Sequence, residues 1–183
     1  TRSLAAMRRA VTARDERLAR LRAELESRSP AARVSALAQR IDHAGARLLV
    51  FPTTLGTHAE WPDRRMHVVL RDHLEQGWIQ MICLDQVHDE SWYAKGLHPG
   101  AMAWRHLQYD RYVEQEVLPF TASINPDPFV IAAGASFGAY HALCFGFRHP
   151  EQVQRLIGMS GLYDIKQMTG GYSDNNVYAC NPF

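Results

Sequence analysis

The segment from Pro128 to Tyr140 most constrains the fold, because it places Ser136 at the centre of a Gly-x-Ser-x-Gly pentapeptide directly behind a short apolar run. Phe129 to Ala133 is predicted to be a buried strand and Ala139 to Arg148 a helix, so Ser136 is expected on a sharp strand-to-helix turn. Glycines on both sides suit such a turn, since a Cβ atom there would meet neighbouring backbone. The pattern predicts a nucleophilic serine, and the alternative is a purely structural glycine-rich turn.

Composition favours a globular domain and says little about partners. The 183 residues are 46% hydrophobic and 21% charged, and the net charge of +1 gives no general attraction to nucleic acid or to an anionic membrane. The sequence contains neither an apolar run long enough to span a membrane nor a secretory signal, so a cytoplasmic protein is expected. The three cysteines are odd in number and scattered, which favours reduced, buried thiols over disulfides.

Residues 1–29 are predicted to form a separate helical extension that ends at Pro30. Apolar residues interrupted by arginines recur there at spacings of three and four, which is typical of a two-stranded coiled coil. They are Leu4, Met7, Val11, Leu18, Leu21 and Leu25. The helix could be a dimerisation arm, could pack on its own domain, or could have no set role. Because its arginines alternate with acids and lack aromatic neighbours, nucleic-acid binding is not favoured.

Residues 30–183 are predicted to form an α/β domain. Strands are expected at 47–51, 78–84, 129–133 and 152–159, helices at 63–76, 100–118 and 139–148, and residues 34–41 fit either state. This alternation implies a mostly parallel, doubly wound sheet whose functional loops follow the carboxyl ends of the strands.

Several segments beyond the pentapeptide carry a family resemblance. They are His43 to Thr53, Cys83 to Tyr93, Glu116 to Phe120, Met159 to Asp164 and Tyr172 to Pro182. Over roughly three quarters of its length the chain resembles the putative esterase family of the α/β-hydrolase superfamily, the group similar to esterase D and to the antigen 85 mycolyltransferases.

The resemblance implies an α/β-hydrolase-like fold, incomplete at the carboxyl end, and a serine esterase with Ser136 as nucleophile. It also implies an oxyanion hole that uses the backbone N–H of Phe137 and a second donor from the loop at residues 53–56. In that loop Thr54 is the first choice and Leu55 the second.

A serine nucleophile needs a histidine base and an acid that orients it, in the order serine, acid, histidine for this fold. After Ser136 the only histidines are His141 and His149. His141 lies within the predicted elbow helix, so it is expected to be a helix-surface or packing residue rather than the base. Asp164 is a conceivable acid, although the resemblance assigns its position to a structural turn. The resemblance places the catalytic histidine beyond Phe183, so we expect either a fragment or a protein that has lost its acid and base.

Asp85 and the histidines give weaker indications of a functional site. Asp85 follows a predicted strand and could support the site, but a capping role in its loop is favoured. The nine histidines form no metal-binding motif, and neither a metal nor a cofactor is expected.

Three functions remain open at this stage. The first is hydrolysis of small acyl esters or thioesters through an acyl-enzyme on Ser136, and the second is acyl transfer from the same serine. The third is a non-catalytic, degenerate hydrolase that acts as an interaction protein. A homo-oligomer could form through the amino-terminal helix or through the open sheet edge near residues 152–159.

Overall fold

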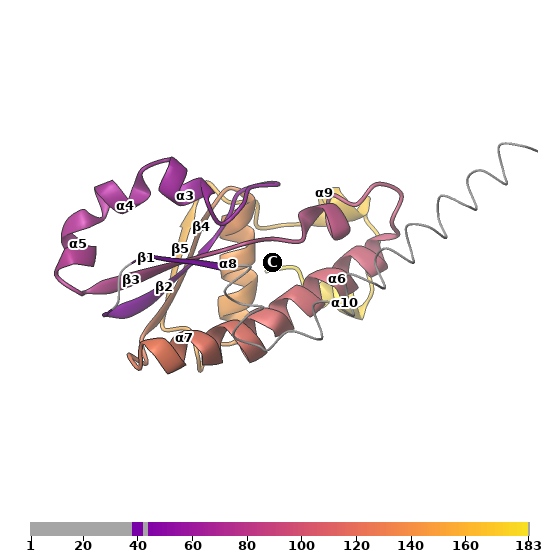
Figure 1. Cartoon of the computed structure of the whole chain (residues 1–183). Helices are drawn as coiled ribbons and strands as arrows, with labels where there is room; N and C mark the ends of the chain where they lie inside the picture. Colours follow the sequence, from indigo (N-terminus) through magenta and orange to yellow (C-terminus); the bar gives the residue numbers. More distant parts are fainter. Residues whose placement is uncertain (1–37, 42–43, 183) are drawn as a thin grey trace, which may run out of the picture. The chain divides into compact units, whose positions relative to one another are not determined.

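The computed structural model describes residues 38–41 and 44–182, so the predicted helical extension at residues 1–29 and its boundary at residue 30 lie outside the described residues (Figure 1). The strands are β1 (Ala38–Ile41), β2 (Ala46–Phe51), β3 (Ile79–Leu84), β4 (Val130–Ala135) and β5 (Arg155–Met159). The helices are α3 (Glu60–Asp63), α4 (Met66–Val69), α5 (Arg71–Glu75), η1 (His88–Glu90), α6 (Pro99–Tyr112), η2 (Val113–Val117), α7 (Leu118–Ile124), α8 (Phe137–Arg148), α9 (Lys166–Thr169) and α10 (Asn175–Ala179).

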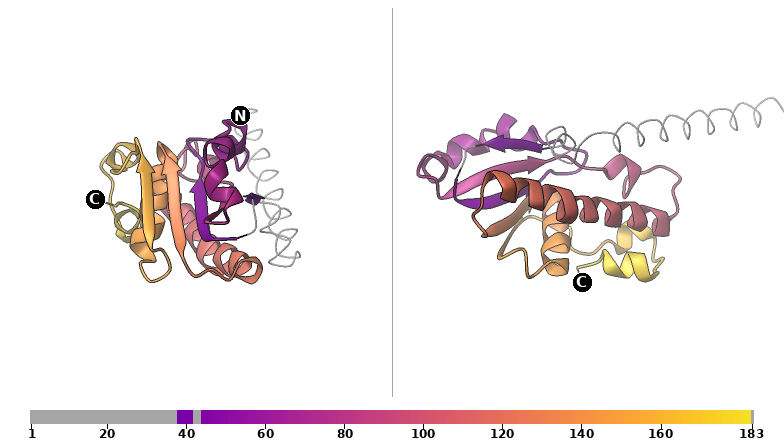
Figure 2. Two further views of the ribbon diagram at one scale, coloured as in Figure 1. Left: turned by 90° about the vertical axis from the view of Figure 1, so that its left-hand side faces the viewer. Right: turned by 60° about the horizontal axis from the view of Figure 1, so that its bottom comes forward.

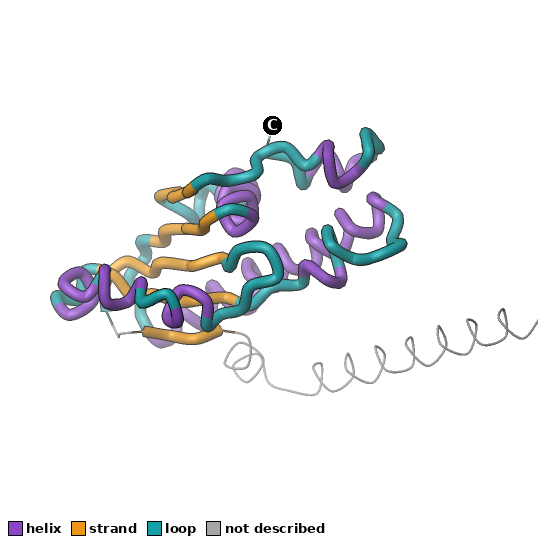
Figure 3. Tube along the Cα trace, turned by 90° about the horizontal axis from the view of Figure 1, so that it is seen from above, coloured by secondary structure: helices purple, strands orange, loops and turns teal. Residues whose placement is uncertain are grey.

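The strands form one mostly parallel sheet in the order β1-β3-β2-β4-β5. β2 pairs in parallel with β3 and β4, and β4 pairs in parallel with β5. Among the strands at residues 38–41 and 44–182, only β1 runs antiparallel, beside β3, so part of the ambiguous segment 34–41 is a strand. Figure 3 shows the strands side by side in orange. The predicted sheet type is therefore confirmed.

Helices cover both faces of the sheet (Figure 2). On one face, Leu48 and Val50 of β2 pack in an apolar cluster with Trp61 of α3 and Leu74 of α5. On the other face, Phe51 contacts the ring of Tyr109 in α6 and the rings of His141 and Phe145 in α8. A second cluster there joins α6, α8 and α10 and includes Trp92, Leu107, Phe137, Tyr140, Ile165 and Val177. Alternate side chains of a strand point to opposite faces, so this two-sided core is the doubly wound arrangement that the sequence predicted.

The single helix predicted at residues 63–76 is wrong. The segment folds as three short helices, α3, α4 and α5, because Arg65 adopts a left-handed backbone conformation (φ 58°) that no continuous helix accommodates. The adjacent β-branched residues Val68 and Val69 are exposed and favour helix weakly.

The helix predicted at residues 100–118 is longer than expected. It continues from α6 through the π-helical segment η2 into α7, and ends at Ile124. Pro119 lies in the first turn of α7 and has no N–H to donate, and the wider π turn directly before it accommodates this gap. The predicted aperiodic tail contains the short helices α9 and α10.

Two further properties concern the described residues as a whole. Cys83, Cys144 and Cys180 are buried free thiols, as predicted. None of the helices in the described ranges has both the length and the apolar character needed to cross a membrane.

Candidate functional site

Ser136 lies between β4 and α8 on the predicted strand-to-helix turn. Its backbone has φ 54° and ψ −121°, and its side chain is exposed. Its N–H donates to the carbonyl oxygen of Met159 at the end of β5, at 2.8 Å. A positive φ at a non-glycine residue costs on the order of 1–3 kcal/mol and persists only where the surroundings fix it. The turn therefore presents the hydroxyl to solvent from a strained backbone.

Close backbone contacts explain the two glycines of the pentapeptide. A Cβ atom on Gly134 would lie 2.2 Å from the carbonyl carbon of Gly138. A Cβ atom on Gly138 would lie 2.2 Å from the backbone oxygen of Phe51 at the end of β2. Any side chain at either position would push α8 away from the sheet. The clash predicted from the sequence is confirmed.

Phe137 is the first residue of α8, so its backbone N–H has no acceptor within the helix. Its ring is buried and lies edge-on to the rings of His88 and Tyr93, with centroid distances of 5.0 and 5.3 Å. This packing fixes the first turn of α8, whose N-terminal end carries a partial positive charge. The arrangement can stabilise an anion that forms beside Ser136.

The loop at residues 53–56 follows β2 and is anchored at its first residue. Thr53 donates from both its N–H and its hydroxyl to the carboxylate of Glu60, at 2.8 and 2.6 Å. Leu55 has φ 54° and donates its N–H to Nδ1 of His88 at 3.0 Å. Among the described residues, the N–H of Thr54 has no hydrogen-bond partner, while its hydroxyl lies 3.2 Å from that of Tyr93. Of the two predicted second donors, Thr54 is the one whose N–H is not already engaged.

Neither histidine that follows Ser136 in the sequence is placed as its base. His141 is buried, its ring is parallel to that of Phe51, and its Nε2 lies 2.8 Å from Nε2 of His88. Of the two roles predicted for His141, at the helix surface or in packing, the structure shows packing. His149 follows the far end of α8, about 20 Å from Ser136 at 1.5 Å per residue, and its Nε2 lies 2.9 Å from Oδ2 of Asp110.

Asp85 lies directly after β3. In the sheet, β2 lies between β3 and β4, and β4 is the strand that precedes Ser136. Its Oδ2 lies 3.3 Å from Nδ1 of His58, and its backbone oxygen accepts from the hydroxyl of Tyr109 at 2.6 Å. Neighbouring strands are about 4.8 Å apart, so the two strand ends are about 10 Å apart. Asp85 is thus tied to neighbours outside the turn around Ser136.

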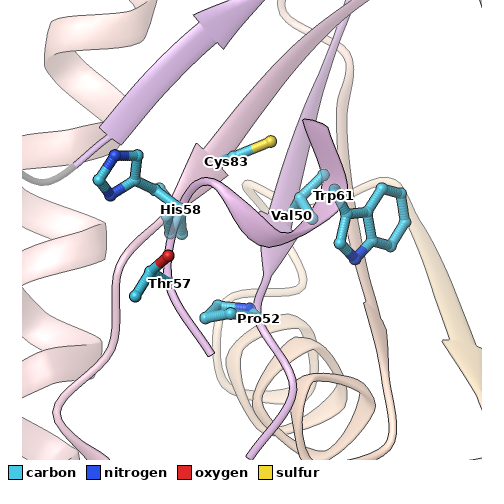
Figure 4. Close-up of a pocket in the computed structure, with 7 residues that line it drawn as sticks. Val50, Pro52, Thr57, His58, Trp61 and Cys83 are labelled. Atoms are coloured by element: carbon cyan, nitrogen blue, oxygen red, sulfur yellow. The ribbon is translucent and has the colours of Figure 1, made fainter. Parts of the chain in front are cut away.

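A pocket beside His58 lies between the loop after β2 and the end of β3 (Figure 4). It is lined by Val50, Pro52, Thr57, His58, Trp61, Cys83 and Leu84. Figure 4 shows the His58 ring directed away from Trp61. The pocket has no room for a molecule of the size of water, so it is not a substrate site.

Asp164 lies between β5 and α9, two residues before the first residue of α9. Its Oδ1 accepts from the backbone N–H of Lys166 at 3.0 Å and from Nδ2 of Asn181 at 3.2 Å, and its Oδ2 lies 3.3 Å from Nζ of Lys166. The backbone hydrogen bond from Lys166 lowers the pKa of Asp164. The carboxylate therefore has structural partners, in a turn of the kind that the resemblance implied.

Sequence reasoning missed a group of buried histidines beneath the turn. Burial lowers the pKa of His88 to about 4 and that of His106 to about 3, and it lowers the pKa of His141 well below 6.5. These rings are neutral at neutral pH. The available signal was the position of His106 on the inward face of α6, next to Ala103 and Leu107. Within the described ranges, no three histidine, cysteine, aspartate or glutamate residues are grouped to hold a metal ion.

A family model described as "Putative esterase" matches residues 79–179, which include β3, β4, β5 and Ser136. A search of curated proteins found no match.

Among solved structures, the chain is similar to a dienelactone hydrolase from Anabaena variabilis, with 19% identity over 68% of this chain and 56% of that one, at a TM-score of 0.46. It is similar to an S-formylglutathione hydrolase from Staphylococcus aureus, with 17% identity over 76% and 52%, at a TM-score of 0.44. It is also similar to an enterochelin esterase from Shigella flexneri, with 20% identity over 69% and 32%, at a TM-score of 0.48. The chain thus spans about half or less of each structure, and at TM-scores below 0.5 none of them assigns it an activity.

Proposed function

Because the chain belongs to the putative esterase family of α/β-hydrolases, we propose that it is a serine hydrolase of small acyl esters or thioesters that acts through an acyl-enzyme on Ser136. The observation that carries this proposal is the conformation of Ser136, exposed and strained between β4 and α8 with both flanking glycines pressed against backbone. A serine held in this way projects its hydroxyl toward a bound carbonyl group.

In the proposed reaction, Oγ of Ser136 attacks the carbonyl carbon of the ester while a base takes its proton. The carbonyl oxygen becomes an oxyanion, which accepts hydrogen bonds from the N–H groups of Phe137 and Thr54. The tetrahedral intermediate then collapses, the proton passes to the departing alcohol or thiol, and the acyl group stays on Ser136 until water releases it. Loss of one such donor typically lowers kcat by about 10²–10³-fold.

The base and the acid are proposed to come from groups outside the described residues, either further chain or another subunit. In the described part, the Ser136 hydroxyl has no hydrogen-bond partner. His149 lies beyond the far end of α8 and His141 is turned to His88. Within the described residues, His58 pairs with Asp85 and makes no hydrogen bond to Ser136. Without a base the hydroxyl stays neutral and is a weak nucleophile.

Hydrolysis of p-nitrophenyl acetate tests this proposal. The 183-residue chain is expected to hydrolyse it slowly, and Ser136→Ala is expected to remove that activity. A longer form of the protein, where the gene encodes one, should hydrolyse the ester several orders of magnitude faster. Fast, Ser136-dependent hydrolysis by the 183 residues would mean that a described histidine is the base, with His58, His88 and His141 the residues to substitute next.

Acyl transfer from the same serine is a second candidate, because the exposed position of Ser136 leaves an acyl-enzyme accessible to an added alcohol. Water and the alcohol then compete for the acyl group. Product analysis with added alcohol separates the two, since only a transferase forms mainly the new ester. A non-catalytic interaction protein is the third candidate, and it predicts that Ser136 does not react with a fluorophosphonate.

A further inference from the structure

Two buried histidines connect the segments that carry the proposed oxyanion donors. His88 begins η1, is fully buried, and has its ring between the loop at 53–56 and α8. Its Nδ1 accepts from the N–H of Leu55 at 3.0 Å, and its Nε2 lies 2.8 Å from Nε2 of His141. His141 belongs to α8, the helix that begins with Phe137. A continuous chain of hydrogen bonds therefore runs from α8 to Leu55.

The backbone N–H of Leu55 determines which atom donates in each of these hydrogen bonds. A backbone N–H can only donate, so Nδ1 of His88 carries no proton. A neutral imidazole has one N–H, which places the His88 proton on Nε2, where it donates to Nε2 of His141. The His141 proton is then on Nδ1. Burial lowers the pKa values of both rings, in agreement with two neutral imidazoles.

The hydrogen bond to His88 is the contact that fixes the backbone of Leu55. Its φ of 54° is unfavourable for a leucine, and its side chain is 53% exposed, so packing contributes little. The turn is closed by Gly56, which donates to the oxygen of Thr53 at 3.0 Å. With Thr53 held by Glu60 and Leu55 held by His88, the peptide of Thr54 between them has little freedom.

We propose that His88 and His141 are positioning residues that set the separation between the N–H of Thr54 and the N–H of Phe137. His141 is anchored against Phe51 and Phe137, with ring centroid distances of 6.2 and 5.1 Å, so it moves with the start of α8. His88, hydrogen-bonded to both His141 and Leu55, holds the loop at 53–56 in place relative to α8. The catalytic consequence rests on the proposed function, whereas the hydrogen-bond chain itself can be measured without it.

Two matched substitutions at His88 test the chain. An asparagine oxygen reaches the place of Nδ1, so His88→Asn keeps an acceptor for Leu55, whereas His88→Gln places its amide near Nε2 and leaves Leu55 without one. Amide hydrogen exchange of Leu55, followed by NMR, should match the wild-type rate in His88→Asn and be about tenfold faster in His88→Gln. Equal Leu55 exchange in His88→Gln and the wild type would overturn the proposal.

The tautomers of the unmodified protein give a second readout that does not depend on a variant's folding. Nitrogen-15 spectra of the histidine rings should show the proton of His88 on Nε2 and that of His141 on Nδ1. The opposite tautomer on either ring contradicts the chain, even if both His88 variants fail to fold.

The activity readout uses whichever form of the protein hydrolyses the ester. His88→Gln should lower kcat about tenfold or more with KM little changed, and His88→Asn should retain most of kcat. Faster Leu55 exchange with an unchanged kcat would overturn the positioning role. An inactive wild-type protein would instead refute the proposed function, while the exchange rates and the tautomers still decide whether the hydrogen-bond chain exists.

Discussion

At the scale of single residues, the turn around Ser136 depends on glycine because backbone from β2 and α8 occupies the space of a side chain. The sequence predicted this turn because the whole signal lies within a few neighbouring residues. The sequence did not predict that His88, His106 and His141 lie together. Their burial results from three elements that are distant in the sequence, and spacing carries no information about such contacts.

Gly138→Ala is expected to lower the free energy of unfolding by about 3 kcal/mol, since its Cβ would lie 2.2 Å from the backbone oxygen of Phe51. Urea unfolding measures the loss. Gly170→Ala is the control, because Gly170 has φ 59° with no atom within 4 Å of the added Cβ, and it should cost about 1 kcal/mol from backbone strain alone. Similar losses for the two variants would contradict the close-contact explanation.

The buried histidines make stability depend on pH. Because burial lowers the pKa of His88 to about 4 and that of His106 to about 3, protons bind the unfolded chain first. The full stability is present above the unfolded value of 6.5. It is lost as pH falls toward about 4 for His88 and about 3 for His106, by up to about 1.4 kcal/mol per pH unit for each ring. The raised pKa of Asp110, caused mainly by burial, acts in the opposite direction at lower pH.

His106→Leu should therefore reduce the slope of the free energy of unfolding between pH 6 and 4.5 by about 1.4 kcal/mol per pH unit. Neither ring nitrogen of His106 has a hydrogen-bond partner in the described part of the protein, so the substitution should not destabilise the protein at pH 7.5. Urea unfolding across this pH range measures both effects. A variant with the wild-type slope would show that His106 is not held neutral.

At the scale of helices and strands, positions were predicted well where a segment is buried on both sides. β2, β3 and β4 are largely apolar, with Arg47 and Gln80 the exceptions, and the structure moves their predicted ends by only one or two residues. The segment between β2 and β3 was predicted poorly because its three short helices bury few residues, chiefly Trp61 and Leu74, which is too weak a pattern to reveal the break at Arg65. The packing of Trp61 and Leu74 on the sheet determines how this segment folds, and the sequence pattern does not report that packing.

Asp110 of α6 and His149, at the end of α8, connect the two helices, and their pair provides a test of how α6 packs against α8. Asp110 is 3% exposed and pairs with His149 at 2.9 Å and with Arg148 at 3.5 Å. His149→Leu should cost about 3–5 kcal/mol in urea unfolding, because it leaves the Asp110 carboxylate buried with a single distant partner.

The matched control breaks an exposed ion pair instead. Arg71→Leu removes the pair with Glu75, whose atoms lie 3.9 Å apart at the surface of α5, and should cost less than about 0.5 kcal/mol. If His149→Leu were as mild as this control, the buried pair would not hold α6 against α8.

At the scale of the whole molecule, the alternation of strands and helices predicted the sheet type, but the order β1-β3-β2-β4-β5 and the antiparallel β1 were not predicted. Strand order depends on which segments meet in space, and the hydrophobic pattern of each strand does not report it. In the described sheet, β5 pairs with β4 alone and exposes Ile157 and Met159 at 44% and 38%. An edge strand with exposed apolar residues favours pairing with another chain.

We therefore expect the 183-residue chain to self-associate through β5, and Ile157→Lys should weaken that association by placing a charge on the strand. Sedimentation velocity over a range of protein concentrations measures the effect. Val69→Lys is the control, since Val69 is 72% exposed on α4, away from the edge. A protein that stays monomeric throughout, or one whose association weakens equally in both variants, would exclude the β5 edge as the interface.

The central claim is that Ser136 is the nucleophile, and covalent labelling with a fluorophosphonate followed by mass mapping of the modified peptide tests it most directly. Ser160 is an internal control, because it is another exposed serine with a positive φ (49°) directly after a strand, β5. We predict one adduct per chain, located on Ser136, lost in Ser136→Ala and retained in Ser160→Ala. Labelling that persists in Ser136→Ala, or a form of the protein that hydrolyses the ester yet stays unlabelled at Ser136, would contradict the account.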